Sequence, residues 1–352
     1  MKIVFDILGS TERSGGMRLH STELLRSWIQ EFPEDQVTLV AGSWAIEEFS
    51  ASVHRVASVS NEGVIGRAIG QLIRTPLVAL RERPDAVISM SPIVSPFVPK
   101  RIAYCFQHDW RHKKNPREFP RLQRVYRRLW EISADHANLN ICISEKAQQE
   151  TLEIVPSAKT MVIENGWDHA RRWGQPPSSS TPRSIVTFGH HNNKRPELLI
   201  RALPLLEEGN REVNLTILGA RGRYASDLRD LAVRLGVNHH VDLPGFVSES
   251  EYERLVMSAS AIALVSSDEG FGLPIAEAAY FGIPSLITSD SGMSGIFGGV
   301  PIVADPDPES IALRLAECLD IPRAREGRAV RSWDNVAQEL RTAVSVDGKL
   351  RS

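Results

Sequence analysis

Short apolar runs alternate with longer amphipathic stretches along the whole chain. Helical periodicity marks the stretches between the runs, for example residues 17–29 and 65–83. Runs that are apolar throughout are typical of strands buried on both faces, as in parallel sheets. The alternation therefore predicts an α/β fold. The runs occupy residues 3–5, 37–40, 86–88, 102–104, 139–144, 161–163, 184–189, 215–219, 241–247, 261–265 and 285–287.

The alternation is interrupted at a segment rich in proline and serine. Residues 175–182 read QPPSSSTP, which is the composition of a linker. A chain of 352 residues is long enough for two domains, each with a full core. We therefore predict a first domain over residues 1–172 and a second over 183–332, followed by a last helix over 333–352.

Composition excludes several classes of function. The net charge of −2 does not suit a protein that coats nucleic acid. Cys105, Cys142 and Cys318 lie far apart without metal-ligand spacing, as expected of buried thiols in a reducing cytoplasm. The first residues turn acidic too early for a signal peptide, and no apolar run approaches the roughly 20 residues of a membrane helix. We expect a cytoplasmic location.

One stretch, Ser266–Glu277, combines a glycine loop with the start of a short helix after the run 261–265. Gly270 and Gly272 allow a tight loop, and Pro274 suits the first helical position. The free N–H groups of Phe271–Leu273 and the helix dipole predict an anion site. Glu269 and Glu277 would repel phosphate, but their carboxylates suit sugar hydroxyls. The pattern indicates a nucleotide-sugar site; the alternative is an ordinary strand–helix turn with a capping glutamate.

Glu269 and Glu277, with Gly-Phe-Gly-Leu-Pro between them, resemble the E-x7-E motif of retaining glycosyltransferases of family 4. That family has the GT-B fold, in which two Rossmann-like domains face each other across a cleft. The resemblance covers nearly the whole chain. It implies that Glu269 contacts the donor sugar, that Glu277 holds the ribose, that Gly270–Leu273 meets the donor, and that the last helix crosses back onto the first domain.

The resemblance assigns further donor-binding residues in the second half. The family usually has an Arg just after the glycine at residue 189, where this chain has His190, and a Lys a few residues later. Lys194 is the best match to that Lys on the diphosphate, with Arg195 as second choice. A missing or relocated positive charge puts donor affinity in question, although His190 can still donate hydrogen bonds. The loop that contains Phe246 is expected against the nucleotide base.

Two positions in the first half match the same family. Gly15 and Gly16 follow the first strand and would face the donor phosphates, although a glycine pair alone also fits a plain turn. His108 and Asp109 follow the strand near residue 104, where open α/β sheets place ligands. The resemblance puts His108 near the donor sugar and the reacting oxygen; the alternative is a solvated loop histidine.

No metal or other cofactor is expected. Asp305-Pro306-Asp307 has the spacing of a metal-binding Asp-x-Asp, but Asp307 precedes Pro308 and Glu309 and is better explained as a helix N-cap. His190 and His191 are adjacent and lack an evident third ligand. The positive charge opposite the diphosphate is expected from Lys194 and the helix N-terminus instead.

Residues 111–128 carry eight basic side chains against Glu118 alone, and part of the segment has amphipathic helical spacing. Such a surface fits anionic lipid headgroups, which favours a peripheral position on the inner face of a membrane and a lipid-linked acceptor. The alternative is a solvated basic helix paired with acids elsewhere.

The sequence thus predicts a retaining transferase that moves a hexose or deoxyhexose, such as mannosyl or rhamnosyl, onto a glycan or lipid-linked glycan of a bacterial surface polysaccharide. Rival predictions are a nucleotide-sugar epimerase or hydrolase on the same fold, and a non-catalytic nucleotide-sugar-binding subunit.

Overall fold

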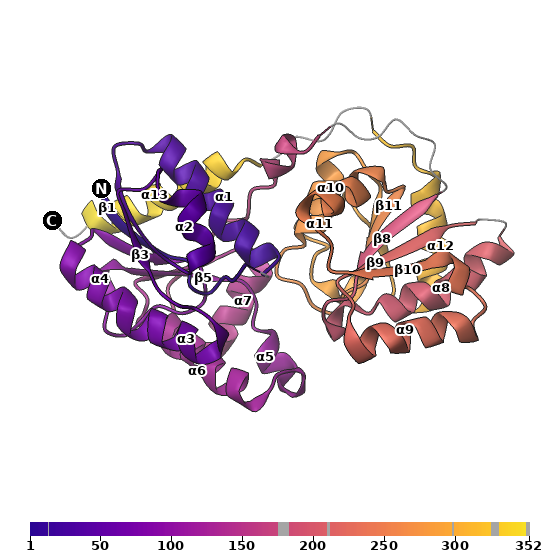
Figure 1. Ribbon diagram of the computed structural model, residues 1–352, viewed down its shortest axis with the longest axis horizontal. Helices are drawn as coiled ribbons and strands as arrows, with labels where there is room; N and C mark the ends of the chain where they lie inside the picture. Colours follow the sequence, from indigo (N-terminus) through magenta and orange to yellow (C-terminus); the bar gives the residue numbers. More distant parts are fainter. Residues whose placement is uncertain (13, 175–182, 210–211, 298, 325–330, 350–352) are drawn as a thin grey trace. The chain divides into compact units, whose positions relative to one another are not determined.

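The computed structural model divides the chain into two compact units (Figure 1). The structure describes residues 1–12, 14–174, 183–209, 212–297, 299–324 and 331–349. Unit 1 comprises Met1–Gly166 and Arg331–Ser352, and unit 2 comprises Trp167–Val330. The predicted linker, 175–182, lies outside the described residues. Residues 167–172 belong to unit 2 rather than to the first domain as predicted, because Asp168–Arg172 packs on the helix that carries Glu277.

Unit 1 is built on a parallel sheet of seven strands in the order β3-β2-β1-β4-β5-β6-β7. The order reverses between β1 and β4, which pair with Ile3 opposite Ala86. The strands are β1 (Lys2–Asp6), β2 (Gln36–Ala41), β3 (Arg55–Ser58), β4 (Ala86–Ser89), β5 (Ala103–Gln107), β6 (Leu139–Cys142) and β7 (Thr160–Val162). The α-helices of this unit are α1 (Gly16–Glu31), α2 (Ile46–Phe49), α3 (Gly63–Ile69), α4 (Thr75–Glu82), α5 (Arg111–Lys114), α6 (Arg121–His136), α7 (Glu145–Ile154) and α13 (Trp333–Lys349).

Unit 2 repeats the architecture with six parallel strands in the order β10-β9-β8-β11-β12-β13. Here the order reverses between β8 and β11. Helices α8, α9 and α12 pack on one face of the sheet, and α10 and α11 lie on the other (Figure 1). The elements are β8 (Ser184–Phe188), α8 (Pro196–Glu208), β9 (Asn214–Leu218), α9 (Gly222–Arg234), β10 (Val241–Gly245), α10 (Glu249–Ser258), β11 (Ala261–Leu264), α11 (Leu273–Tyr280), β12 (Ser285–Thr288), β13 (Ile302–Ala304) and α12 (Pro308–Asp320).

Short helical turns complete the two units. A π-helical turn, η2 (Gly70–Arg74), joins α3 to α4. The remaining turns are of the 3-10 type: η1 (Ser43–Ala45), η3 (Lys100–Ile102), η4 (Pro116–Glu118), η5 (Asp168–Arg172), η6 (Asn192–Lys194), η7 (Asn238–His240) and η8 (Ser289–Ser291).

The strands of both sheets carry apolar side chains on both faces, and these side chains form much of each core. The residues of β4 and β11 are all buried, which is the pattern that predicted parallel strands. The predicted α/β class with two Rossmann-like domains is confirmed. The strand expected over 102–104 begins one residue late, because Lys100–Ile102 forms a 3-10 turn.

The last helix, α13, packs against α1 of unit 1. Where the chain returns to unit 1, it passes very close to Gly166: a Cβ atom on that glycine would lie 2.6 Å from the backbone nitrogen of Trp333. Arg341 then pairs with Asp35, at 3.1 Å between Nε and Oδ2, and Gln338 donates to Glu31 at 2.7 Å. A side chain at position 166 would therefore displace the start of α13.

Candidate active site

The predicted donor residues of unit 2 gather where the strand order reverses. The loops after β8 and β11 lie at the carboxyl ends of these neighbouring strands, the usual ligand position in open α/β sheets. Lys194 Nζ donates to the Glu269 carboxylate, and both side chains are largely buried. The structure thus brings together two predicted residues that are 75 positions apart in sequence. A cation and a carboxylate stand side by side at the expected sugar-diphosphate site.

Backbone and amide bonds hold these two loops in register. Asn193 donates to the Asp268 carbonyl at 2.9 Å, and the Ser267 N–H donates to the Asn193 carbonyl at the same distance. Asn193 is buried, so these bonds are shielded from water. The Glu269 N–H donates to the Ser291 carbonyl at 3.0 Å. Lys194 and Glu269 therefore project from a fixed frame.

Arg195 has a positive φ of 47° and a heavily bonded guanidinium. It donates to both carboxylate oxygens of Asp290, at 2.7 and 2.8 Å, and to the Val265 carbonyl at 2.9 Å. The pKa of Asp290 is lowered: burial opposes the shift, and the bonds from Arg195 outweigh it. Through this bidentate pair and its bond to Val265, Arg195 connects the loop after β8 to the carboxyl ends of β11 and β12.

The start of α11 depends on Gly272. Its φ is +93°, and a Cβ atom there would lie 2.4 Å from the Met293 sulfur, so only glycine fits without rearrangement. Leu273 opens the helix with Pro274 at its second position, as the sequence predicted to within one residue. Phe271 is buried against Phe297, with ring centroids 5.6 Å apart. The N–H groups at this helix end lie where the sequence predicts an anion site.

Glu277 is buried in the second turn of α11 and is held by two side chains that the sequence analysis did not identify. His169 Nε2–H donates to Oε1 at 3.0 Å, and the Tyr252 hydroxyl donates to Oε2. Burial and the adjacent carboxylate raise the pKa of Tyr252 well above its usual value, so it remains a donor. Each carboxylate oxygen accepts more than one hydrogen bond, so Glu277 retains capacity for ligand hydroxyls.

An exposed aromatic side chain marks the carboxyl end of β10. Phe246 is 60% exposed, and the Arg221 guanidinium lies over its ring at 5.2 Å from the centroid. A flat base can stack on such an exposed ring. His190 and His191 are exposed at the end of β8, with ring centroids 4.9 Å apart. Arg221 was not predicted, because the sequence around it matches no motif that the sequence analysis identified.

Unit 1 brings three polar side chains together at the carboxyl ends of its strands. His108 follows β5, His20 lies on α1, and Asn165 follows β7. The His20 and His108 rings meet edge to face with centroids 4.8 Å apart. His20 Nδ1–H donates to Asn165 Oδ1 at 2.8 Å, and His108 Nε2–H donates to the Met90 carbonyl at 3.0 Å. All three side chains are buried.

These contacts fix the protonation of both rings. Burial lowers the pKa of His108, and burial together with His108 lowers that of His20 well below its usual value, so both rings are neutral at pH 7. With Nε2 of His108 donating, Nδ1 is its acceptor nitrogen. Burial acts to raise the pKa of Asp109, but the guanidiniums of Arg127 and Arg111 outweigh it and the pKa is lowered. Among the described residues, His20 Nε2 has no hydrogen-bond partner.

Gly15 and Gly16 occupy the N-terminus of α1, as the glycine pair indicated. Gly16 is the first helical residue and Gly15 its N-cap. Both are exposed, and a Cβ atom on Gly15 would meet nothing within 4 Å. Within unit 1, neighbouring atoms therefore do not limit the size of a side chain at position 15.

Asp307 is a helix cap, as the sequence predicted. Its Oδ1 accepts the Ser310 N–H at 2.8 Å at the start of α12, which occupies it in the helix rather than in an Asp-x-Asp site. Within the described parts of the chain, one group of three could place metal-ligand atoms together: Glu207, His239 and His240. There His240 lies 3.4 Å from Glu207, the geometry of an ion pair at the opposite end of the sheet from Lys194.

Residues 111–128 are partly neutralised by acids. Arg111 lies 3.6 Å from Glu118, Lys113 lies 2.5 Å from Glu131, and Lys114 lies 2.5 Å from Glu150. Arg127 is packed on Phe119 and Trp130, at 4.2 and 4.5 Å from their ring centroids. The remaining cations of the segment are exposed: Arg117, Arg121, Arg124 and Arg128.

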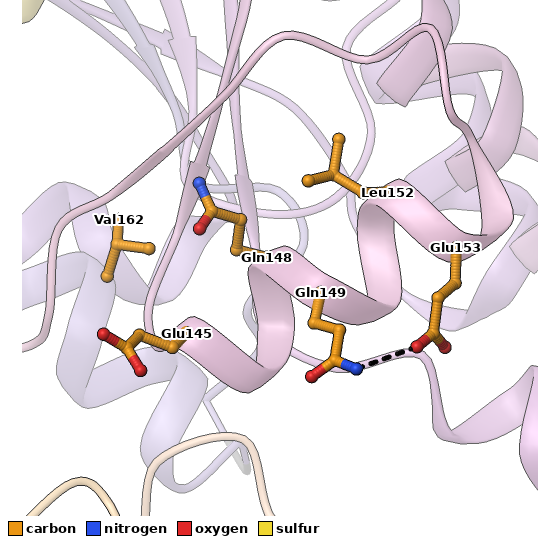
Figure 2. A pocket seen from close by; sticks show the side chains of 6 residues that line it. All are labelled: Glu145, Gln148, Gln149, Leu152, Glu153 and Val162. Atoms are coloured by element: carbon orange, nitrogen blue, oxygen red, sulfur yellow. Dashed lines mark hydrogen bonds between the residues drawn. The ribbon is translucent and has the colours of Figure 1, made fainter.

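A shallow depression of about 650 Å³ on unit 1 contains no predicted site residue. It lies along α7 and β7 (Figure 2). Gln149 donates to Glu153 across one side of it at 3.1 Å. Its lining combines acids and amides with two apolar side chains and contains no buried polar group: Glu145, Gln148, Gln149, Leu152, Glu153 and Val162. We assign it no part in the chemistry.

Comparison with known proteins identifies both units. Residues 14–171 match the family Glycosyltransferase Family 4, and residues 175–332 match the family Glycosyl transferases group 1. The two matches together span most of the chain. The protein is therefore built from two domains that each match a glycosyltransferase family.

Individual relatives are distant. GDP-mannose:cellobiosyl-diphosphopolyprenol alpha-mannosyltransferase from Komagataeibacter xylinus is 28% identical over 53% of this chain and 50% of its own length. The chain thus spans about half the length of the curated relatives that it matches first. Sucrose-phosphate synthase from Thermosynechococcus elongatus has a TM-score of 0.75 at 14% identity, covering 98% of both chains. Anabaena HepE, solved with UDP and glucose, has a TM-score of 0.72 at 18% identity over 98% of this chain and 99% of that one. These similarities confirm the GT-B fold.

Proposed function

We propose that this protein is a retaining glycosyltransferase that moves a hexose or deoxyhexose from a nucleotide-sugar to a glycan or lipid-linked glycan. The observation that carries the proposal is the pairing of Lys194 with Glu269 beside the α11 N-terminus. A positive site for a diphosphate and a carboxylate for sugar hydroxyls stand together there. The match to mannosyltransferase relatives supports a mannosyl or related donor and a role in bacterial surface polysaccharide synthesis.

In this proposal, unit 2 holds the donor. Lys194 and the N–H groups of Phe271–Leu273 stabilise the negative charge that grows on the departing diphosphate. Glu269 orients the sugar, and Glu277, held by Tyr252 and His169, accepts the ribose hydroxyls. Phe246 offers its exposed ring to the base.

Unit 1 would hold the acceptor. His108, with Nε2–H bonded to the Met90 carbonyl, presents Nδ1 to a sugar hydroxyl. The bond between the anomeric carbon and the diphosphate oxygen breaks with its electron pair on the phosphate. The acceptor oxygen then bonds to the same face, and its proton passes to the leaving diphosphate. No residue is assigned as a covalent nucleophile, so positioning and charge stabilisation supply the catalysis.

Product analysis tests the proposal. The protein is incubated with nucleotide-sugars, with and without a diphosphate-linked lipid glycan acceptor, and products are resolved by mass spectrometry. Transfer that requires the acceptor and retains the anomeric configuration is expected. Free sugar or an epimerised donor without acceptor would instead support the rival epimerase or hydrolase. Donor binding without any turnover would support a non-catalytic subunit, for which the histidine at position 190 is the motivating feature.

A screen of donors identifies the base and sugar. Thermal shift with a panel of nucleoside diphosphates and nucleotide-sugars is suitable, because a ligand at 100 times its Kd adds about 2.7 kcal/mol to stability.

We further propose an anionic membrane surface as partner, reached through the basic segment 111–128. The four exposed arginines of that segment support this, while its other cations are paired or packed.

We also propose that transfer needs no divalent metal, since Lys194 and the α11 N-terminus supply the positive charge and Asp307 caps a helix. Activity in excess EDTA is expected to equal that with magnesium or manganese. Activity that is lost in EDTA and restored by either ion would contradict this proposal. If a metal supplied the positive charge in place of Lys194, the Lys194→Ala variant would keep a near-native rate at saturating metal.

A further inference from the structure

The first unit exposes an apolar stripe along the helical segment 63–82. Five large side chains on it point to solvent: Ile65, Ile69, Ile73, Leu77 and Leu80, with exposed fractions of 64, 48, 51, 53 and 75%. Their spacings of four, four, four and three residues place them along one side of the segment. Surface helices normally turn such a stripe toward the core. A contiguous exposed apolar stripe of this size marks an interaction surface.

The stripe is not the packing face of a displaced helix, because another side of the same segment is already buried. Gln71, Thr75 and Ala79 lie in the interior. Thr75 donates to Asp6 at 2.6 Å, and Tyr126 of α6 donates to Gln71 at 2.5 Å. The segment is thus fixed to the sheet and to α6 while its apolar stripe remains outside.

Helix α6, which packs beside α3, adds apolar side chains (Figure 1). Leu122, Val125 and Ile132 are 54, 60 and 52% exposed. Their spacing of three and seven residues places them on one face of α6. We call the exposed faces of residues 63–82 and 121–132 the α3–α6 surface.

The charge of the α3–α6 surface selects its partner. The two segments contain two acids, Glu82 and Glu131, and each lies against basic side chains: Glu82 against Arg55 and Arg81, and Glu131 against Lys113. The α3–α6 surface is therefore basic, although the whole chain has a net charge of −2. Arg74, Arg81, Arg121, Arg124 and Arg128 are exposed. The two segments contain seven arginines: Arg67, Arg74, Arg81, Arg121, Arg124, Arg127 and Arg128. A second copy of the chain would set arginines against arginines, whereas anionic lipid headgroups neutralise them.

We propose that the α3–α6 surface lies in the interface of an anionic membrane, with its apolar side chains below the headgroups and its arginines among them. Exposed apolar side chains beside basic residues are typical of helices that lie in the membrane plane. In the part of the chain that the structure describes, no helix has the length and apolar character to cross a bilayer. The inference rests on the proposed lipid-linked acceptor and moves the centre of membrane contact from residues 111–128 to the apolar stripe.

Vesicle flotation of the full chain, without donor or acceptor, tests the proposal. Vesicles of phosphatidylglycerol with phosphatidylcholine are compared with phosphatidylcholine alone. We expect binding to the anionic vesicles, and at least a tenfold weaker partition for Ile69→Gln/Ile73→Gln/Leu77→Gln, about 1.4 kcal/mol. The matched control is Val233→Gln/Leu313→Gln in unit 2, whose side chains are 62 and 63% exposed and whose partition should stay unchanged.

Three results would overturn the proposal. They are equal indifference to both vesicle types, unchanged binding by the stripe variant, and a stripe-dependent dimer in solution without vesicle binding. Circular dichroism and the melting temperature verify that each variant is folded. If the stripe variant still shows the donor-induced thermal shift and transfers to a water-soluble acceptor, loss of vesicle binding reports on the surface alone. A chain that binds vesicles but transfers nothing would contradict the proposed function and leave the surface standing.

Discussion

At the scale of single residues, the two glutamates of the Glu269–Glu277 pair have different environments. Glu269 stands in a loop with the Lys194 ammonium as partner, whereas Glu277 is enclosed and bonded by His169 and Tyr252. A loop carboxylate beside a cation can contact the reacting sugar. A buried, fixed carboxylate is suited to holding a part of the ligand that does not react.

We therefore expect Glu269→Ala to lower kcat by about a hundredfold or more, the range seen when a transition-state contact is removed. Steady-state kinetics at saturating donor measures this. The control is Glu317→Ala, an exposed glutamate of α12 whose partner is Arg314 and which lies outside the proposed site. Near-native turnover by Glu269→Ala would show that the role given to this residue is wrong.

The environment of Glu277 leads to a second expectation. Tyr252→Phe removes one donor to the buried carboxylate, and hydrogen bonds to charged groups are worth about 1.5–3 kcal/mol. We expect both Tyr252→Phe and Glu277→Ala to raise the donor KM tenfold or more while kcat changes little. Isothermal titration with the nucleoside diphosphate checks the affinity directly. A large fall in kcat at unchanged KM would place Glu277 in the chemistry instead.

The residue scale also shows where sequence reasoning ends. Lys194 was predicted from the family resemblance, and Glu269 and the α11 start from the glycine loop that follows the run 261–265. The structure pairs Lys194 with Glu269. Tyr252, His169 and Arg221 were missed. They lie on elements whose sequence carries no site pattern, and only the packing of α10 and η5 on α11 brings the first two to Glu277.

At the scale of elements, apolar runs located every interior strand but only two of the four edge strands. Strands β7 and β10 were predicted and β3 and β13 were not; all four are only partly buried, so an apolar run marks them less clearly than it marks an interior strand. The segment 65–83 was predicted as one continuous helix, but the structure inserts a π-helical turn before α4. Pro76 accounts for this, since it lacks an N–H and would clash with the carbonyl four residues earlier in a regular helix.

The element α5 contains a histidine whose titration should be visible in stability. His112 is enclosed by Trp110, Trp130 and Phe119, and burial followed by the charge of Arg127 lowers its pKa to about 4. Neither ring nitrogen has a hydrogen-bond partner among the described residues. In the unfolded chain His112 therefore binds a proton near pH 6.5, whereas in the folded protein it binds one only near pH 4.

Stability should accordingly fall as the pH decreases from 6.5 toward 4, and His112→Phe should weaken that dependence. Asp6 acts in the opposite direction, since burial raises its pKa to about 6 and its contribution falls as the pH rises through that value. Because wild type and His112→Phe both contain Asp6, the difference between their free energies of unfolding in urea reports the contribution of His112. An identical pH dependence in wild type and His112→Phe would refute the argument.

At the scale of the whole molecule, each unit has its own sheet, core and carboxyl-end loops. Most of the proposed donor residues belong to unit 2. Gly15 and Gly16, which are predicted to face the donor phosphates, belong to unit 1 together with His20, His108 and Asn165. Glycosyltransferase domains of two families are joined in one chain in this way. Binding of the nucleotide part of the donor should therefore stabilise mainly unit 2.

Differential scanning calorimetry should show two transitions, because the units are separately packed. A nucleoside diphosphate at 100 times its Kd adds about 2.7 kcal/mol to the unit that binds it. For a domain of this size, that energy raises the midpoint by roughly 5–10 °C. Only one transition should move. Hydrogen exchange assigns it, with added protection expected in unit 2 around α11 and the loop that contains Lys194.

Lys194→Ala is the control for this experiment, because it removes a proposed phosphate contact while leaving both cores intact. It should abolish most of the shift and leave the two unliganded transitions near their original temperatures. A single transition that shifts as a whole would mean that the two units unfold together. Protection gained equally in both units would mean that the nucleotide contacts unit 1 as much as unit 2, and the expectation that unit 2 carries most of the nucleotide contacts would then fail.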